Sequence, residues 1–174
     1  GVDELTNMVM QFSAKAVKAY TQHVQDNAEE AVRRIIETLK DGDFSAPMDD
    51  GSVINVRITV DKNNRSATVD FSGTSEQRSN NYNAPSAICR AAVLYVFRTL
   101  VDHDIPMNEG CLKPLRLIIP TGSMLNPKAP AAVVAGNVET SQIICDALFG
   151  ALGRLAASQG TMNNLTFGNN HFQY

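Results

Sequence analysis

The chain has 174 residues and a hydrophobic content of 44%, which suits one globular domain burying roughly 70% of its unfolded surface. A net charge of −3, an aromatic content of 6% and the absence of tryptophan argue against a nucleic-acid-binding face, which needs clustered positive charge and stacking rings. Three cysteines without Cys-x-x-Cys spacing give neither a disulfide framework nor a zinc pattern, so we expect reduced thiols in the cytoplasm.

The first 40 residues have the apolar periodicity of helices. Over residues 3–40, apolar side chains recur every three or four positions in two successive stripes. Asn27 followed by Glu30 resembles a capping box, so we expect two helices, or one kinked helix, with a break near residues 25–27. Both stripes are expected to pack inward, with the charges in solvent. The stripes are Leu5, Met8, Val9, Phe12, Ala16, Tyr20 and Val24, then Ala28, Val32, Ile35, Ile36 and Leu39.

Strict alternation follows over residues 53–71. Isoleucine and valine at every second position from 54 to 60 alternate with polar residues, and the sequence at 61–64 is typical of a turn. The alternation then resumes through Val69 and Phe71. This pattern predicts an antiparallel hairpin with one solvated face.

The middle of the chain predicts one more helix and one more strand. A polar loop at 72–83, whose hydrogen-bonding groups must face water, a ligand or another domain, leads into a helix expected over 84–101. Asp102-His103-Asp104 is interpreted as the end of that helix rather than a metal site, because adjacent side chains point in different directions. A short strand is expected over 115–119. The expected inner face of the helix is Ile88, Ala91, Ala92, Tyr95 and Leu100.

The least ordinary chemistry lies in two polar runs, residues 136–142 and 158–164, at either end of a helix expected over 139–157. The unpaired N–H groups and the dipole at a helix start favour an anion or a polar ligand. A helix of this length spans about 30 Å, which argues against one site served by both runs. One face of the helix carries only small residues, which another helix or a backbone can approach closely: Gly150, Gly153, Ala156 and Ala157.

These elements together predict an α+β fold, with long helices packed on one face of a small, mostly antiparallel sheet. Residues 1–174 are expected to form a single domain. The chain carries no internal repeat and no low-complexity tract.

Six motifs occur in order along the chain: Asp70-Phe71-Ser72-Gly73-Thr74-Ser75, Asn83-Ala84-Pro85-Ser86, Ile105-Pro106-Met107-Asn108-Glu109-Gly110, Pro120-Thr121-Gly122-Ser123-Met124-Leu125-Asn126-Pro127, Gly136-Asn137-Val138-Glu139-Thr140-Ser141-Gln142, and Ala157-Ser158-Gln159-Gly160-Thr161-Met162-Asn163-Asn164. Their order and spacing resemble the hydantoinase B/5-oxoprolinase family over essentially the whole chain. Acetone and acetophenone carboxylase subunits are similar more distantly.

The resemblance implies that the chain is a middle portion of a much longer B subunit. The implied activity is ATP-dependent opening of a cyclic amide, either a hydantoin or 5-oxoproline. It also implies an A-type partner subunit, or region, with an actin-like fold that binds the ATP. We expect no cofactor in this fragment, since no P-loop pattern is present and the family's metal-like segment, which lies toward its N-terminus, has no counterpart here. The fragment alone is expected to be inactive, within a homo- or hetero-oligomer that binds neither nucleic acid nor membrane.

Ring opening requires a polarised amide carbonyl and an activated water. ATP can polarise the carbonyl by phosphorylating its oxygen, after which the protein must supply oxyanion donors and a base. Glu139 is the only carboxylate of the run 136–142 and is our candidate base or amide acceptor; the alternative is a first-turn acid that complements the helix dipole. The substrate-binding candidates are Asn83, Asn137, Thr140, Ser141, Gln142, Ser158, Gln159, Thr161, Asn163 and Asn164.

Two classes of function remain open from the sequence. In the first, the polar runs line an active site that other segments of the enzyme complete. In the second, the chain is a structural or interaction module that docks the A-type subunit or builds the oligomer, for instance through the face of Gly150 and Gly153. Within the first class, carboxylation of a ketone is an alternative to hydrolysis.

Overall fold

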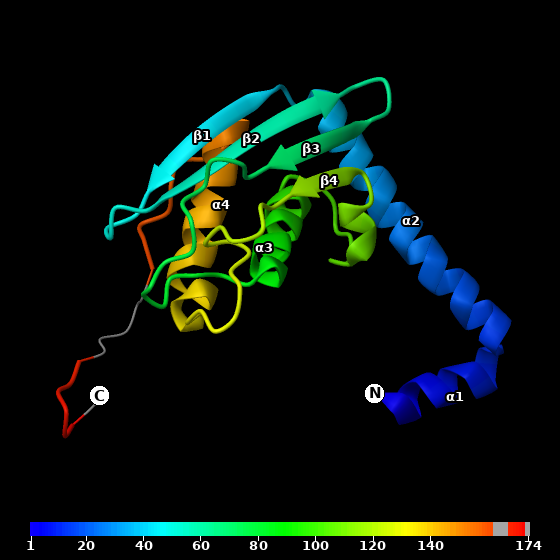
Figure 1. Ribbon diagram of the computed structural model, residues 1–174. Helices are drawn as coiled ribbons and strands as arrows, with labels where there is room; N and C mark the ends of the chain where they lie inside the picture. Colours follow the sequence, from blue (N-terminus) through cyan, green and yellow to red (C-terminus); the bar gives the residue numbers. More distant parts are fainter. Residues whose placement is uncertain (162–166, 173–174) are drawn as a thin grey trace.

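The computed structural model describes residues 1–161 and 167–172, which form an α+β fold of helices packed against a mixed sheet (Figure 1). The strands lie in the order β1-β2-β3-β4; β1/β2 and β2/β3 are antiparallel and β3/β4 is parallel. The expected fold class is therefore confirmed. The elements are α1 (Val2–Phe12), α2 (Ala14–Thr38), β1 (Gly42–Pro47), β2 (Val53–Asp61), β3 (Ser66–Asp70), α3 (Ser86–Thr99), the 3₁₀ turn η1 (Glu109–Leu112), β4 (Leu115–Ile118), the 3₁₀ turn η2 (Val134–Asn137) and α4 (Glu139–Leu152).

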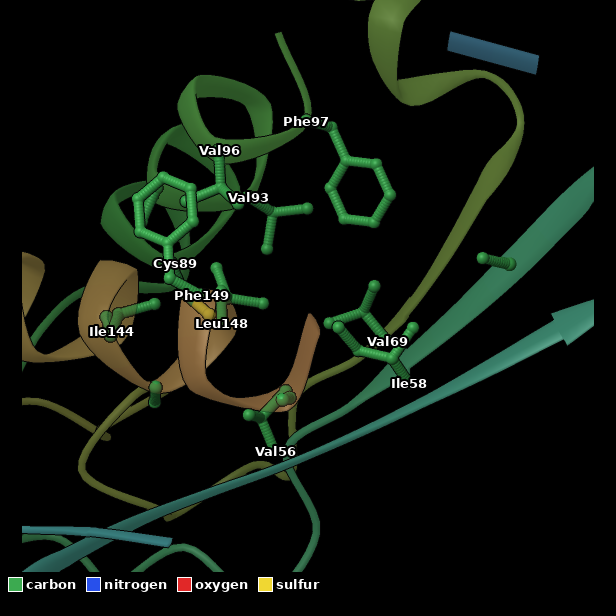
Figure 2. Close-up of a cluster of buried hydrophobic side chains, with 14 of the residues drawn as sticks. Val56, Ile58, Val69, Cys89, Val93, Val96, Phe97, Ile144, Leu148 and Phe149 are labelled. Carbon is green, nitrogen blue, oxygen red and sulfur yellow. The ribbon is translucent and has the colours of Figure 1, made fainter. Parts of the chain in front are cut away.

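The predicted hairpin forms β2 and β3. Ile58 pairs with Val69, and both side chains are fully buried on the inner face of the sheet. Residues at alternate positions, such as Arg57 and Thr59, face solvent. Figure 2 shows the inner face meeting side chains from α3 and α4, including Phe97 and Leu148. The alternation in the sequence was thus sufficient to orient this hairpin.

The first strand, β1, was not expected from the sequence, because Gly42–Pro47 is poor in strand-forming residues. Close contact with α4 holds it in place. A Cβ on Gly42 would lie 2.0 Å from the carbonyl oxygen of Ala151, and a Cβ on Gly150 would lie 2.7 Å from the ring of Phe44. The small-residue face predicted on α4 therefore packs, at Gly150, against Phe44 of β1 in the same chain.

The break between the first two helices lies at Ser13, where φ is 72°, and the prediction of a break near residues 25–27 is wrong. The Ser13 hydroxyl accepts a hydrogen bond from the N–H of Ala16, as an N-cap does (3.4 Å). Glu30, which suggested the capping box, instead forms ion pairs with Arg34 and Arg65.

The two apolar stripes of the N-terminal helices have different environments. The second stripe packs on the body of the protein, where Ala28, Val32 and Ile36 are fully buried. The first stripe does not pack inward, contrary to the prediction: Leu5 is 55% exposed and Phe12 is 56% exposed. Figure 1 shows α1 and the first half of α2 standing away from the sheet. Within the described residues, no helix is both long and apolar enough to span a membrane.

The buried face of α3 matches the predicted one only at Ala92. Cys89, Val93, Val96 and Phe97 are fully buried (Figure 2), whereas Tyr95, expected inside, is 52% exposed. Apolar residues occur around most of this helix, so periodicity alone could not select the buried side. Of the other predicted residues, Ile88, Ala91 and Tyr95 border a groove described below.

The last helix, α4, is shorter than the predicted range 139–157. It has 14 residues and ends at Leu152, because Gly153 adopts the left-handed conformation with φ of 60°. The helix therefore spans about 21 Å rather than 30 Å. The chain then runs back beside the helix, which changes the relation between the two polar runs.

Candidate functional site

The start of α4 lies in a junction of segments that are distant in sequence. Gly136 packs directly on the backbone at Asn83, where an added Cβ would lie 2.3 Å from the carbonyl oxygen. The N–H of Ala135 donates to the carbonyl of Asn81 (3.0 Å), and the Thr140 hydroxyl donates to the carbonyl of Tyr82. The motifs at 83–86 and 136–142 therefore meet in space.

Asn83 is the centre of this junction and is fully buried. Its Oδ1 accepts a hydrogen bond from the N–H of Arg78 (2.7 Å), and its Nδ2 donates to the carbonyls of Arg78, Asn80 and Ala132 (3.0, 3.0 and 2.9 Å). Both polar atoms of the side chain thus have partners within the chain. Thr140, also fully buried, is placed in the same way. Their positions favour an architectural role for these two substrate-binding candidates.

The junction extends to a carboxylate that the sequence analysis did not single out. Asp50, in the turn after β1, accepts hydrogen bonds from the Ser52 N–H (2.9 Å), the Ser52 hydroxyl and the Nδ2 of Asn80 (2.7 Å). The bond from the Ser52 hydroxyl is the main reason that the pKa of Asp50 lies below its usual value, and the Arg78 guanidinium at 3.7 Å adds to it. A single Asp in a turn gives no sequence signal for such a network.

The polar loop at 72–83 is also held by the segment 120–128. The N–H of Gln77 donates to Gly122 and the N–H of Met124 donates to Ser75, both at 2.9 Å. The side chain of Gln77 accepts a hydrogen bond from the N–H of Lys128 (2.6 Å). The expectation that this loop faces water, a ligand or another domain therefore needs correction, because many of its polar groups bind other loops of the same chain.

The outer side of α4 forms one wall of a groove with α3, which we call the α3–α4 groove. Its volume is about 290 Å³. Three predicted site residues, Asn137, Ser141 and Gln142, line it, while Thr140 between them points inward. The other lining residues are Cys145 of α4 and Ile88, Ala91, Ala92 and Tyr95 of α3. An apolar wall on α3 thus faces amide and hydroxyl groups on α4.

The polar groups of the groove differ in their availability. The Ser141 hydroxyl donates to the carbonyl oxygens of Asn137 and Val138 (2.9 and 3.1 Å), so its hydrogen is directed at the helix start. Among the residues that the structure describes, Gln142 makes a single long contact, from its Nε2 to Asp146 (3.4 Å). Burial, with the nearby Asp146 charge as a smaller cause, raises the pKa of the Cys145 thiol to about 11.

The segment after Gly153, residues 154–161, which we call the return segment, runs back along another side of α4. The N–H and hydroxyl of Ser158 both donate to the Asp146 carboxylate at 3.0 Å. Farther along, the Thr161 hydroxyl donates to the carboxylate of Glu139 in the first turn of α4. The two polar runs therefore do meet, because the helix stops early and the chain reverses.

The predicted site residues consequently fall into three places. Asn83 and Thr140 lie in the buried junction; Asn137, Ser141 and Gln142 lie in the α3–α4 groove; Glu139, Ser158 and Thr161 lie where the return segment meets α4. Gln159 is exposed, and Asn163 and Asn164 fall outside the described residues. Glu139 does not line the groove.

No metal site emerges from the residues that the structure describes, where no three His, Cys, Asp or Glu side chains are placed to hold an ion together. The Asp102-His103-Asp104 run follows the end of α3. There His103 contacts Asp102, and Asp104 lies 3.5 Å from Arg98. All three side chains of the run are exposed.

Comparison with known proteins places the whole chain in one family. A family model described as hydantoinase B/oxoprolinase matches residues 1–174. The chain is 42% identical to 5-oxoprolinase 1 of Arabidopsis thaliana, covering 100% of the chain and 15% of that protein. It is 26% identical to a Pseudomonas protein that is named as the B component of a D-/L-hydantoinase, covering 91% of the chain and 30% of that protein.

Solved structures share the fold at low sequence identity. An ATP-dependent caprolactamase from Pseudomonas jessenii matches with a TM-score of 0.65 and 18% identity, over 84% of this chain and 27% of that one. The nucleotide-free structure of an acetone carboxylase matches with a TM-score of 0.68 and 15% identity, over 86% of this chain and 22% of that one.

Proposed function

The chain belongs to the hydantoinase B/oxoprolinase family, and we propose that it forms part of the B portion of an ATP-dependent enzyme that opens a small cyclic amide. The chain spans 15% of the length of the 5-oxoprolinase that it resembles at 42% identity, so the complete reaction belongs to a larger protein. In this proposal an A-type subunit or region binds ATP and activates the amide. The present chain supplies one wall of the ring-binding site.

The observation that carries the proposal is the composition of the α3–α4 groove. A small lactam or hydantoin ring has an apolar edge and an amide edge. In the groove, Ile88 and Ala91 can contact the apolar edge of the ring, and the side chains of Asn137 and Gln142 can hydrogen-bond its amide edge. At about 290 Å³ it is large enough for one ring of this kind. Other segments of the longer protein would close it.

The ring-binding role is tested by filling the groove. Ala91→Leu in the full-length protein, assayed with its A-type partner, places a larger side chain in the groove at an exposed position. We expect KM for the ring substrate to rise about tenfold or more with an unchanged melting temperature, since lost binding of about 1.4 kcal/mol is a factor of ten. Ala87→Leu, one turn earlier, exposed and outside the groove, is the matched control. Equal KM in both variants would refute the proposal.

Glu139 has a separate proposed role. Its carboxylate lies at the start of α4 beside the return segment and outside the α3–α4 groove. It could take a proton from the attacking water if the ring amide reaches past Asn137 to the start of α4 and the Thr161 hydroxyl moves aside. Loss of a general base lowers turnover by roughly 10²- to 10⁴-fold. Glu139→Gln should therefore reduce kcat of ring opening by that factor while folding and partner binding persist. Near-normal turnover would leave Glu139 as a first-turn acid that complements the helix dipole.

Ring opening is preferred to ketone carboxylation for one reason. The similarity to the acetone carboxylase is one of fold, at 15% identity, whereas the relative at 42% identity is named a 5-oxoprolinase. Measuring ATP hydrolysis with 5-oxoproline, with a hydantoin and with acetone plus bicarbonate would separate these activities. We expect turnover with one of the cyclic amides and none with the ketone.

A further inference from the structure

The N-terminal helices carry an apolar surface that the described chain does not cover. We define the arm as residues 2–24, which comprise α1 and the first half of α2. Among the described residues, α1 has no contact that buries any of its 11 residues. Isolated helices of fewer than about 12–15 residues are marginal in water, and most helices in proteins depend on packing of an apolar face. With 11 residues, α1 therefore needs a partner on its apolar face to be stable.

The uncovered surface is continuous and concave. At the bend between α1 and α2 lies a notch of about 380 Å³, lined by five side chains without charge: Met8, Phe12, Ala16, Val17 and Tyr20. The large residues remain open to solvent, with Phe12 56% and Tyr20 73% exposed. Contiguous apolar surface of this kind marks an interaction site rather than an ordinary protein surface.

The same face of α2 is already a packing interface farther along the helix. Tyr20, Val24 and Ala28 are spaced four residues apart and so lie on one side of α2, and Ala28 is fully buried against the body. Next to it, η1 packs so closely that a Cβ on Gly110 would lie 2.1 Å from the carbonyl oxygen of Gln25. The arm thus extends the face that α2 uses in the core of the chain, beyond the point where the described core stops.

We infer that a further amphipathic helix of the same polypeptide occupies the notch of the arm. A family relative that matches the whole chain is several times longer, since the chain covers 15% of it, so most of the polypeptide is expected to lie outside these residues. The notch is formed by side chains of helices whose backbone groups bond within the helices. A strand or loop laid on it would leave its own N–H and C=O groups unpaired, whereas a helix would not.

A segment of the same polypeptide fits the chemistry better than a separate subunit or a second copy. The described lining of the notch has no charged residue and continues a buried core, as in permanent interfaces that resemble a divided domain interior. Transient and exchangeable interfaces are more polar. This inference rests on family membership and does not depend on the ring-binding role of the α3–α4 groove.

The test compares two methionines of α1 in the full-length protein. Met8 lines the notch, whereas Met10, two residues later, lies outside it and is 73% exposed. Residues two apart on a helix do not share a face, so Met10→Glu is a matched control for Met8→Glu. We would measure hydrogen exchange of residues 2–24 and the molar mass by light scattering, each with and without the A-type partner.

The expected result is a protected arm in the wild type, with or without the partner. Met8→Glu should exchange in this region at least about tenfold faster, since a buried methionine is lost, while Met10→Glu behaves as the wild type. The molar mass should stay the same in all three proteins. Free exchange of the wild-type arm would overturn the inference. Protection that appears only with the A-type partner would overturn it by placing that subunit in the notch. A lower molar mass of Met8→Glu would overturn it by placing a second copy there.

Discussion

The inner and outer sides of α4 begin within the same short motif and meet different surroundings. Thr140 is fully buried and donates its hydroxyl to the carbonyl of Tyr82, whereas Gln142, two residues later, lines the α3–α4 groove. The inner side belongs to the network around Asn83, and the outer side lines the groove that we propose to bind the ring. One short motif thus contains residues that hold the fold together beside residues that face a groove.

The largest effect should come from the centre of the inner network. Asn83→Ala removes partners from an N–H and three carbonyl groups, and we expect a loss of about 3 kcal/mol in the free energy of unfolding. Asn137→Ala, at an exposed asparagine of the outer side, should change stability by less than about 0.5 kcal/mol. Urea unfolding of the full-length protein measures both. Similar losses in the two variants would abolish the distinction between the sides.

A smaller loss is expected from crowding the same junction. In Gly136→Ala the new Cβ would lie 2.3 Å from the carbonyl oxygen of Asn83, so the backbone must move apart. Overpacking of this kind costs roughly 1–3 kcal/mol. A lower melting temperature with unchanged KM in the folded protein is the expected outcome. A raised KM at unchanged stability would instead assign Gly136 to the substrate side.

The pH dependence of stability should reveal the contribution of Asp50, whose hydrogen bonds to Ser52 and Asn80 lie beside the network around Asn83. The pKa of Asp50 is lowered in the folded state, mainly by the Ser52 hydroxyl, and its side chain is 16% exposed. A lowered pKa stabilises the fold above the unfolded value of about 3.9, and this contribution is lost as the pH falls through the folded pKa. Between pH 7 and pH 3 the melting temperature of Asp50→Asn should therefore fall less than that of the wild type. The difference should correspond to about 1 kcal/mol in the free energy of unfolding.

The adjacent exposed carboxylate provides the control for that series. Asp49→Asn makes the same change in net charge without touching the bonds to Ser52 and Asn80. The Asp50 assignment fails if both variants follow the same curve as the wild type.

The smallest effect concerns a thiol on the outer side. Because burial raises the pKa of Cys145 to about 11, its alkylation should be slow at pH 7 and should accelerate about tenfold per pH unit up to pH 9. Mass spectrometry of the peptide that contains Cys145 measures the rate. A cyclic amide bound in the groove should slow it further. Rapid alkylation at pH 7 would show that the groove is more open to water than its lining indicates.

The sequence predicted the parts of the fold that local patterns determine. The hairpin of β2 and β3 follows from the alternation of apolar residues, and the α+β class follows from the order of elements. The strand β1 was missed because its stability comes from pairing with β2 and from contact of Phe44 with Gly150. Such contacts join distant segments, so no local propensity reports them.

The places of the candidate residues in the fold could be anticipated only in part, for the same reason. The polar runs were identified from their composition, and Gly153 offered a stop signal that the predicted range 139–157 passed over. The reversal after Gly153 brings Ser158 to Asp146 and Thr161 to Glu139. Whether a polar residue faces the protein or a groove depends on tertiary packing. For this reason Thr140 and Ser141 could not be separated from the sequence.

The most direct test of the account compares Thr140→Val with Gln142→Ala in the full-length protein assayed with its A-type partner. Melting temperature and KM for the ring substrate would be measured for each. We predict that Thr140→Val lowers the melting temperature and leaves KM unchanged, because it removes a buried hydrogen bond. Gln142→Ala should raise KM several-fold and leave the melting temperature unchanged. The account would be contradicted if both variants altered the same quantity, or if each altered the quantity assigned to the other.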